Sequence, residues 1–477
     1  MKTECTPVQM EFQGLGRRKV QAAFDGGHVS SDGGALLLRE TDLRFDLCRR
    51  FAQCFTDYRN EAFVEHELVV LIRQRVLGLC LGYEDLNDHD TLSLDALLAT
   101  ACGNRDPEGK LRSNRRAREL GRALAAHSTL DRLELTPEVV NWVDPKRRYY
   151  KLVHHPEQID AFFVDLFLED FKEAPEEVVL DFDPTDITLH GGQEDRFFHG
   201  YYRNYCYLPM YVFCGDRFVA VRLRSSDRDA SDGALELLAY LVERIRAVFP
   251  RTRIVIRGDS SFAREALMRY CEQGEELYYI FGLARNPRLI EAIRLQLHEA
   301  RQHYQETQHA ARVYTEFRYR TLKTWSRNRR VVAKAEHLEK GTNPRFVVTN
   351  LPGREIHSRE LYEGHYCPRG DMENRIKEQQ LDLFGDRSSS HFFRTNQLRL
   401  WFSALAYVLM NTMRKLALKK TRLAKATSAT IRTLLLKIGA RLIVSVRRVA
   451  VHLASAAPYQ DVFIQAWRNL HAYPLRL

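Results

Sequence analysis

Residues 178–273 alternate short apolar runs with amphipathic segments, in an order that few folds accommodate. Three runs typical of β-strands come first, at residues 178–183, 205–214 and 218–224. Apolar residues at helical spacing then fill residues 231–249. A short strand of the buried type follows at 253–257, and Ser260 or Ser261 can cap a further helix after it. The predicted order is strand, strand, strand, helix, strand, helix.

This order is the topology of a ribonuclease-H-like sheet, so the predicted fold class is mixed α/β. A chain of 477 residues is too long for one core, and about three domains are expected at roughly 150 residues each. The pattern divides the chain into a mainly helical N-terminal domain at 1–150, a ribonuclease-H-like core split between 175–300 and 353–410, a β-rich insertion at 301–352, and a basic helical region at 411–477.

Two β-rich segments lie outside the predicted core. A leading hairpin is expected from a strand at residues 20–24, a turn at Asp25-Gly26-Gly27 and a second strand from His28. In the insertion, strand-like patterns occupy residues 313–321, 330–335 and 345–349.

Two aspartates end strands of the predicted core. Asp183 closes the first strand, where Pro184 limits continuation, and Asp259 closes the fourth. Open α/β sheets place ligands at the carboxyl ends of their strands, and these two strands are neighbours in a ribonuclease-H-like sheet, so both carboxylates are expected to meet at one edge. Asp181 shares a strand face with Asp183 because side chains alternate with period two, and it remains the rival for the first position.

A third carboxylate, Glu373, lies in a helix predicted to start near Pro368. Arg369, Glu373 and Lys377 recur every four residues and therefore share one helix face. Two-metal phosphoryl transfer needs carboxylates that converge on a pair of cations, and neighbouring basic side chains can hold phosphate. The alternative is a surface ladder of ion pairs.

Several motifs in this order resemble those of the DDE transposases of bacterial insertion sequences. They are LDFDPTD at residues 180–186, RFFHGYY at 196–202 and RGDSSF at 257–262. Two further motifs, GYEDLND at 82–88 and RGDMENRIKEQQ at 369–380, are similar to those of the insertion-sequence family numbered thirteen-eighty, which uses the group 1 DDE domain. The resemblance runs from about residue 12 to residue 456 and also implies a β-rich insertion before the Glu.

The resemblance implies metal-dependent DNA phosphoryl transfer by Asp183, Asp259 and Glu373, with two Mg²⁺ or Mn²⁺ ions as cofactors. It implies cut-and-paste transposition, in which a homodimer binds the terminal inverted repeats of double-stranded DNA, cleaves there and joins the 3′-hydroxyl ends to target DNA. In the wider group the last helix carries Tyr, Arg, Glu and then Lys. Tyr366, Arg369 and Glu373 fit, but Gln380 stands in the Lys position, which leaves Lys377 as a candidate substitute.

Basic residues outside this set are candidate DNA contacts. Residues 411–450 contain eleven Lys or Arg and no Asp or Glu, which favours a DNA track or, alternatively, a helix on an acidic surface of another domain. The N-terminal domain is expected to bind DNA. Five of its arginines would form a phosphate-binding face or, alternatively, a solvated helix face: Arg112, Arg115, Arg116, Arg118 and Arg122.

The insertion mixes aromatic and basic side chains. Trp325 stands beside Arg327, Arg329 and Arg330, a combination that can stack a displaced base and grip its backbone. Alternating aromatic residues also often fill the core of a sheet. Trp325 and the three arginines are therefore candidate DNA contacts, with a place in the sheet core as the alternative for Trp325.

Other signals narrow the class of protein. Nine cysteines without a C-x-x-C pair argue against a zinc finger or a disulfide framework, and a reducing cytoplasm fits them best. The resemblance implies a bacterial cytoplasm, with the protein at the nucleoid. The longest apolar run, residues 401–410, is about half a membrane span, so no membrane association is expected. Residues 103–110 miss the spacing of a phosphate loop, so no use of ATP is expected.

Two rival functions remain open from the sequence. One is a ribonuclease-H-like, metal-dependent nuclease without strand transfer. The other is a non-catalytic DNA-binding protein descended from a transposase. The intact set of Asp183, Asp259 and Glu373 speaks against the second rival.

Overall fold

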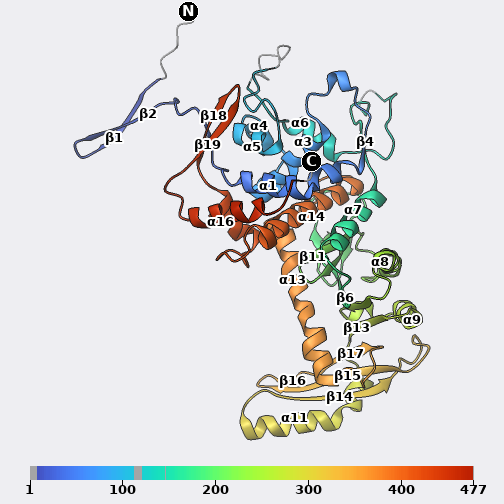
Figure 1. The fold of residues 1–477 in the computed structure, drawn as a ribbon. Coiled ribbons are helices and arrows are strands. Elements are labelled where there is room, and N and C mark those ends of the chain that lie inside the picture. Colours follow the sequence, from blue (N-terminus) through green and yellow to red (C-terminus); the bar gives the residue numbers. More distant parts are fainter. Residues whose placement is uncertain (1–7, 112–120, 145–146, 476–477) are drawn as a thin grey trace, which may run out of the picture. The chain divides into compact units, whose positions relative to one another are not determined.

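The computed structural model describes residues 8–111, 121–144 and 147–475. The chain forms two compact units, Met1–His154 together with Leu405–Leu477, and His155–Ala404 (Figure 1). The first unit therefore combines the two ends of the sequence, while the second is continuous.

The second unit is built on a mixed sheet of nine strands within the described residues. Five of them are β6 (Glu177–Pro184), β10 (Met210–Cys214), β11 (Arg217–Arg222), β12 (Arg253–Gly258) and β13 (Leu277–Leu283). They lie in the order β11-β10-β6-β12-β13, with β6, β12 and β13 parallel and β10 and β11 antiparallel. This arrangement confirms the ribonuclease-H-like prediction and the mixed α/β class, with β6 beside β12.

Helices cover this part of the sheet and complete its core. They are α7 (Pro156–Glu169), α8 (Ala234–Val248) and α9 (Glu265–Gln273). Helix α8 contributes an apolar stripe that includes Leu237, Leu241 and Ile245, all at most 2% exposed. Apolar side chains of β6 and β12 belong to the same cluster, so the carboxyl ends of both strands are held on a rigid base.

The run predicted as one strand at residues 205–214 is divided in two. Strand β9 (Asn204–Tyr207) belongs to a small sheet with β7 (Ile187–Thr188) and β8 (Phe197–His199), and only β10 joins the large sheet. The prediction of one strand was wrong because Pro209 has no N–H to donate to a ladder and separates the two segments.

The predicted β-rich insertion continues the large sheet. After α10 (Pro287–Ala292) and α11 (Arg294–Thr307) come β14 (Ala311–Tyr319), β15 (Arg329–Leu338), β16 (Gly341–Thr342) and β17 (Arg345–Thr349). The three predicted strands are thus present. Strand β17 pairs antiparallel with β13, and Phe346, Val347 and Val348 on it are at most 3% exposed, so the insertion shares the core of the sheet.

The helix that carries Glu373 begins earlier than predicted. A continuous helical run starts with α12 (Ser358–Glu360), passes through a π-helical turn, η4 (Leu361–Tyr366), and a 3₁₀ turn, η5 (Cys367–Arg369), and reaches α13 (Gly370–Lys377) and a second π-helical turn, η6 (Glu378–Asp382). Pro368 was taken as a helix start, but it lies inside the run. The irregular turns accommodate a residue that cannot donate an N–H.

The first unit is helical in its N-terminal part, as predicted. Its helices are α1 (Ala35–Phe45), α2 (Leu47–Ala52), α3 (Leu68–Leu81), α4 (Asp88–Leu92), α5 (Ala96–Cys102) and α6 (His127–Glu134), with short elements η1 (Glu61–Phe63), β4 (Phe55–Asp57) and β5 (Leu152–His154). Helix α3 is buried from Leu71 onward except for Arg73, and it ends at Gly82, whose φ of 96° suits glycine.

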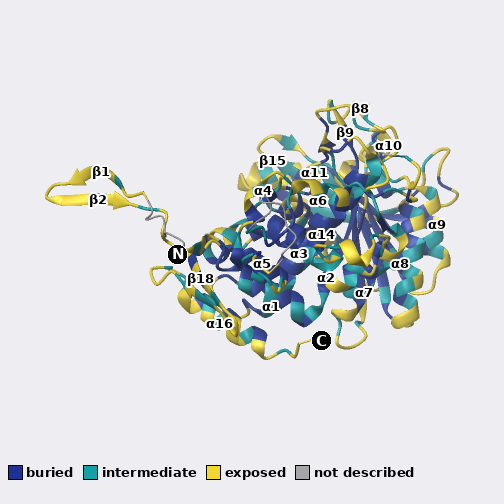
Figure 2. Cartoon of the chain, turned by 90° about the horizontal axis from the view of Figure 1, so that it is seen from above, coloured by how far each residue is buried: buried dark blue, intermediate teal, exposed yellow. Residues whose placement is uncertain are grey.

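The leading hairpin differs from the predicted one. Strand β1 (Met10–Leu15) pairs with β2 (Arg18–Ala22) around a tight turn at Gly16, and both strands are exposed along nearly their whole length (Figure 2). Strand β3 (His28–Ser30) pairs instead with β18 (Ala440–Ser445). The partner of β3 lies about four hundred residues away, beyond the reach of a local pattern.

The helical prediction for residues 411–477 is correct only in part. Helix α14 (Phe393–Leu416), α15 (Ser428–Ile431), the π-turn η7 (Arg432–Leu436) and α16 (Gln460–His471) are present, but β18 and β19 (Arg448–Leu453) form a hairpin between them. Buried Ala440 and Leu442 alternate there with exposed Arg441 and Ile443, the period of a strand. None of the described helices is long and apolar enough to span a membrane.

Candidate active site

Asp183 and Asp259 stand at the carboxyl ends of the adjacent strands β6 and β12. The register pairs Arg257 with Asp181 and Gly258 with Phe182, so the next pair in this register is Asp259 and Asp183. The side chain of Asp183 is 15% exposed. Both aspartates therefore lie at one edge of the sheet, as their strand positions predicted.

Local hydrogen bonds fix the carboxylate of Asp259. Its Oδ1 accepts from the backbone N of Ser261 over 2.8 Å and from Ser261 Oγ over 2.5 Å. It thereby caps the short 3₁₀ turn η3 (Ser260–Phe262). The Ser of the motif thus orients the carboxylate, while Oδ2 is not used in these bonds.

Two glycines allow side chains to approach this edge closely. A Cβ on Gly258 would lie 2.6 Å from the ring of Phe262, which packs over the strand end. A Cβ on Gly282 of β13 would lie 2.6 Å from Tyr366 Oη and 3.0 Å from the backbone N of Ser260. Both positions therefore require glycine for packing, not for an unusual backbone angle.

The third residue reaches the site from α13. Arg369 Nη1 donates to Asp183 Oδ1 over 3.0 Å, and Arg369 Nη2 donates to Glu373 Oε1 over 3.2 Å. The side chain of Glu373 is 48% exposed, whereas that of Arg369 is 18% exposed. The shared helix face predicted for Arg369 and Glu373 is thus present, and it faces Asp183.

The charges of Asp259 and Glu373 act on the carboxyl group of Asp183. Burial raises the pKa of Asp183 to about 7; the guanidinium of Arg369 opposes this rise, and the negative charges of Asp259 and Glu373 add to it. A carboxylate such as Asp183, whose ionisation is disfavoured by burial and by neighbouring negative charges, is stabilised by cations. Carboxylate oxygens are ligands that suit hard divalent ions. Among the described residues, however, no three His, Cys, Asp or Glu side chains lie close enough together to hold a metal ion.

Asp181 has a different environment from Asp183. Its carboxylate is 2% exposed and receives two hydrogen bonds from Arg257, one of them from Nη2 over 2.7 Å. Arg257 also donates to the carbonyl oxygen of His365. Asp181 is therefore engaged in a buried ion pair that ties β6, β12 and the helical run together.

The family model for the transposase DDE domain, group 1, matches residues 12–475, nearly the whole chain. The chain belongs to this DDE transposase family. No curated protein is significantly similar in sequence. Among solved structures, the synaptic complex of piggyBac transposase with hairpin DNA is similar to 84% of this chain and 79% of that one, with a TM-score of 0.41 and 10% identity. The family membership expected from the motifs is confirmed.

In this transposase, Tyr366 lies close to the carboxylates. Its hydroxyl occupies the space beside Gly282, and burial and the charge of Asp259 raise its pKa, against the effect of Arg369. Lys377 is exposed on α13, one turn beyond Glu373. Gln380 is buried and its Nε2 lies 3.5 Å from the carbonyl oxygen of Asp186, so the Lys position of the wider group holds a neutral side chain here.

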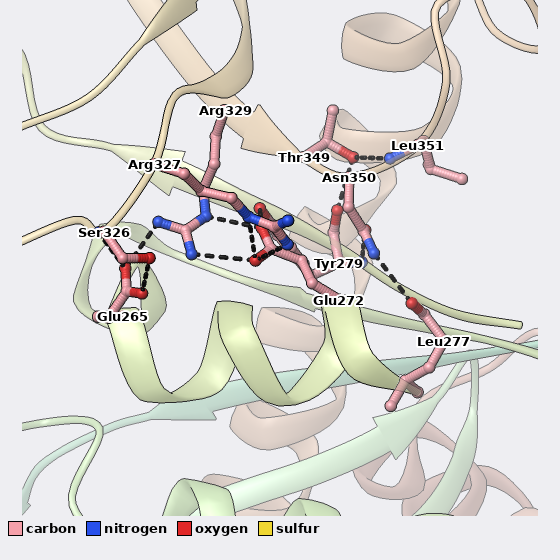
Figure 3. A network of polar contacts seen from close by, with 10 residues as sticks. All are labelled: Glu265, Glu272, Leu277, Tyr279, Ser326, Arg327, Arg329, Thr349, Asn350 and Leu351. Atoms are coloured by element: carbon pink, nitrogen blue, oxygen red, sulfur yellow. Dashed lines mark hydrogen bonds and ion pairs between the residues drawn. The ribbon is translucent and has the colours of Figure 1, made fainter. Parts of the chain in front are cut away.

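The candidate DNA contacts of the insertion are largely internal in the transposase. Trp325 is 6% exposed and packs edge-on against Tyr319, with ring centroids 5.8 Å apart. Arg329 is 2% exposed and donates to Glu272 over 2.7 and 3.0 Å and to Glu265 over 2.7 Å (Figure 3). These contacts give Trp325 the structural role that was its alternative from the sequence, and they hold Arg329 in a buried ion-pair network that the sequence did not predict.

The two other arginines of the insertion differ in exposure. Arg327 is 57% exposed and shares the carboxylate of Glu272 with Arg329 (Figure 3). Arg330 is 7% exposed and donates to Glu316 and to the carbonyl oxygens of Leu351 and Ile356. Of the three, Arg327 alone presents most of its side chain to solvent.

Some basic side chains of the segment 411–450 are paired within the first unit, and others are exposed without being part of those pairs. Arg432 donates to the carbonyl oxygens of Leu79 and Cys80 at the end of α3, and Lys437 lies 2.7 Å from Asp32. The exposed members include Lys419, Lys420, Lys425, Arg441, Arg447 and Arg448. Of the N-terminal arginines, those at 112, 115, 116 and 118 lie outside the described residues.

The segment from β7 to β9, which follows Asp183 in the chain, was not among the predicted site residues. Strand β7 starts three residues after β6 ends and pairs with β9. Burial and the charges of Asp186 and Asp183 raise the pKa of Tyr202, in the β8–β9 turn, to about 12. The sequence did contain a signal for this segment, because the motif at residues 196–202 belongs to the family resemblance and follows Asp183 in the chain.

Proposed function

We propose that this DDE transposase performs cut-and-paste transposition of a bacterial insertion sequence, cleaving at terminal inverted repeats and joining the freed 3′-ends to target DNA. The observation that supports the proposal is the bridging of Asp183 and Glu373 by Arg369, with Asp183 and Asp259 next to each other at the carboxyl ends of β6 and β12. Carboxylates at that place in an α/β sheet are arranged for ligands.

The proposed metal ligands are Asp183, Asp259 and Glu373, with Mg²⁺ or Mn²⁺ as the cations. Two such ions, when bound, would activate the attacking oxygen and stabilise the leaving oxygen at phosphorus. The buried pairing of Asp181 with Arg257 supports Asp183 as the first ligand, because Asp181 would have to give up two charged hydrogen bonds.

The remaining residues of the site would position the DNA. Arg369 balances two of the carboxylates and can exchange one of them for a phosphate oxygen, since a guanidinium forms similar paired hydrogen bonds to both. Tyr366 presents its hydroxyl beside the end of β12, and Ser261 holds Asp259 in one orientation. Lys377 is exposed one turn farther along α13, where it can contact a phosphate of the DNA backbone.

Wider contacts with double-stranded DNA would come from the exposed basic residues of the segment 411–450 and from Arg327. Phosphate contacts of this kind supply affinity without sequence specificity. A homodimer on two DNA ends, acting at the nucleoid in the cytoplasm, completes the proposal, because both ends of an element have to be cut and joined together.

The test is excision from a supercoiled donor plasmid that carries the terminal repeats of the element. Purified protein with Mg²⁺ or Mn²⁺ should release the element and join it to a second plasmid. The Asp183→Ala, Asp259→Ala and Glu373→Ala variants should bind the repeats and release nothing. Excision by these variants at the wild-type rate would overturn the proposal.

A metal-dependent nuclease without strand transfer is the second candidate. Metal-dependent hydrolysis of DNA would use the same carboxylates at the ends of β6 and β12, so their arrangement fits this function too. The same plasmid assay separates the two functions, because a nuclease would give nicked and linear donor without joined products.

A further inference from the structure

The helical run that carries Glu373 covers the same face of the sheet as the two proposed aspartate ligands. Side chains alternate along a strand, so every second residue of β6 up to Asp183 and of β12 up to Asp259 shares this face. Val255 on this face packs in one buried cluster with Tyr362 of η4. The run therefore lies over the two strands whose ends hold the aspartates.

A buried ion pair lies between this apolar contact and the carboxylates. Asp181 and Arg257 are paired in the strand register, two residues before Asp183 and Asp259. Their side chains are 2% and 10% exposed. The guanidinium donates from Nε to Oδ1 of Asp181 and from Nη2 to Oδ2, so the pair is held by a fork of two charged hydrogen bonds.

The remaining nitrogen of the guanidinium reaches the helical run. Nη1 of Arg257 donates to the carbonyl oxygen of His365. The run is irregular there, because the N–H of Cys367 donates to the carbonyl of Tyr362, five residues earlier, and Pro368 has no N–H to donate. Arg257 thus adds a donor from the sheet at the point where the helix departs from regular hydrogen bonding.

This contact can fix where Glu373 lies along the strands. His365 is about two turns before Glu373, and apolar packing alone is non-directional, so a directional bond from the sheet limits sliding and rotation of the run. The other polar link, from Arg369 to Asp183, uses a carboxylate that is itself a proposed metal ligand. The bond from Arg257 uses none of the proposed ligands and remains available when they hold cations.

We propose that the ion pair of Arg257 with Asp181 positions Glu373 and thereby sets the affinity of the site for divalent cations. Both residues act through the helical run, without touching a cation or DNA. Groups that orient metal ligands from outside typically change metal affinity by about 10- to 100-fold. The inference rests on the proposed function, since it takes Glu373 as a metal ligand.

The test replaces the whole ion pair by apolar side chains in the variant Asp181→Leu/Arg257→Met. Removing both partners of a buried pair often leaves a fold as stable as before, whereas removing one does not. The readout is binding of Mn²⁺ to the metal-free protein without DNA, followed by the electron paramagnetic resonance signal of free Mn²⁺. The double variant should unfold at the urea concentration of the wild type or above it, and bind Mn²⁺ at least about 10-fold more weakly. Wild-type affinity in this variant would overturn the inference.

A second variant, Arg257→Lys, keeps Asp181 and a positive partner for it. A lysine ammonium is a point charge that can pair with Asp181 but lacks the fork that spans Asp181 and His365. The variant should therefore fold and bind Mn²⁺ more weakly than the wild type. Unchanged affinity in Arg257→Lys would overturn the inference, because a loss confined to the double variant would mean that Asp181 itself binds the cation.

Two controls make the result specific. Arg75→Met/Glu134→Leu removes a pair of similar burial in the first unit, where the side chains are 7% and 0% exposed, and should keep the wild-type affinity for Mn²⁺. An equal loss there would overturn the inference, since any buried pair would then have the same effect. Asp259→Ala should lose Mn²⁺ binding. If it does not, the proposed function fails; if it does while Asp181→Leu/Arg257→Met keeps binding, only the positioning inference fails.

Discussion

Arg369 joins helix α13 to strand β6, because its Nη1 lies 3.0 Å from Oδ1 of Asp183, 186 residues earlier in the chain. The same guanidinium holds Glu373 through its other amino group. One cation thus brings together two of the proposed metal ligands that come from different elements. It also supplies the positive charge that opposes the raised pKa of Asp183.

Replacing Arg369 should make the site depend on divalent cations for stability. In metal-free buffer, Arg369→Gln is expected to lower the free energy of unfolding by about 1 to 3 kcal/mol, since a largely buried carboxylate loses its partner. Added Mg²⁺ should restore more stability to the variant than to the wild type. Thermal unfolding with and without Mg²⁺ measures both effects, and Lys377→Gln, exposed on the same helix, is the matched control. A variant as stable as the wild type without metal would contradict this account.

Gly282 should tolerate no side chain. In Gly282→Ala the new Cβ would meet Tyr366 Oη at 2.6 Å and the N of Ser260 at 3.0 Å, so the end of β12 or the tyrosine has to move. A displacement of about 1 Å at a reacting group can cost roughly 100-fold in rate, and we expect a plasmid-cleavage rate at least about 10-fold lower. Gly370→Ala on α13, where a Cβ meets nothing within 4 Å, should cleave normally. Equal rates for the two variants would argue against the close approach.

The ion pair between Glu272 and Arg329 should contribute to the free energy of unfolding, whereas the ion pair between Glu272 and Arg327 should contribute little. Glu272→Gln removes the charge that faces Arg329, which is 2% exposed, and should lower the free energy of unfolding by about 3 kcal/mol. Arg327→Gln affects a side chain that is 57% exposed and should cost less than about 1 kcal/mol. Urea denaturation of both variants tests the contrast. Similar losses in both would show that the network is not organised around Arg329.

Acid should destabilise the first unit through His89. Burial lowers the pKa of this imidazole to about 3, below its unfolded value near 6.5. Between these values the unfolded chain binds a proton that the folded chain does not, so stability falls as pH falls through this window, by about 5 kcal/mol over its full width. His89→Gln should show a shallower loss between pH 6 and pH 4 in urea denaturation. Identical pH profiles for variant and wild type would exclude this role.

The sequence predicted the part of the fold that local patterns encode. The apolar runs that become β6 and β12 are short, buried and ended by Asp183 and Asp259, and a parallel sheet brings such ends together. The face shared by Arg369 and Glu373 followed from helical spacing alone. What the pattern could not tell was that Asp181 is neutralised by Arg257 on the next strand, since that contact depends on strand register.

The failures have a common origin in distant partners. Arg329 can be buried because it pairs with Glu265 and Glu272 on α9. Both glutamates lie more than fifty residues earlier in the chain, so nothing near Arg329 in the sequence reveals them. Strand β3 pairs with β18 from the other end of the chain, so its expected local hairpin does not form. The helix through Pro368 was missed because a proline usually marks a helix start, whereas here irregular turns accommodate it.

The most direct test of the central claim is metal rescue at Asp259. Asp259→Cys places a thiolate where a carboxylate ligand is proposed, and sulfur is a poor ligand for Mg²⁺ but a better one for softer metals such as Mn²⁺. The measurement is nicking of a supercoiled plasmid that carries the element's ends, in Mg²⁺ and in Mn²⁺. The account predicts no nicking by the variant in Mg²⁺ and partial recovery in Mn²⁺. Nicking in Mg²⁺ at the wild-type rate would contradict the assignment of Asp259 as a metal ligand.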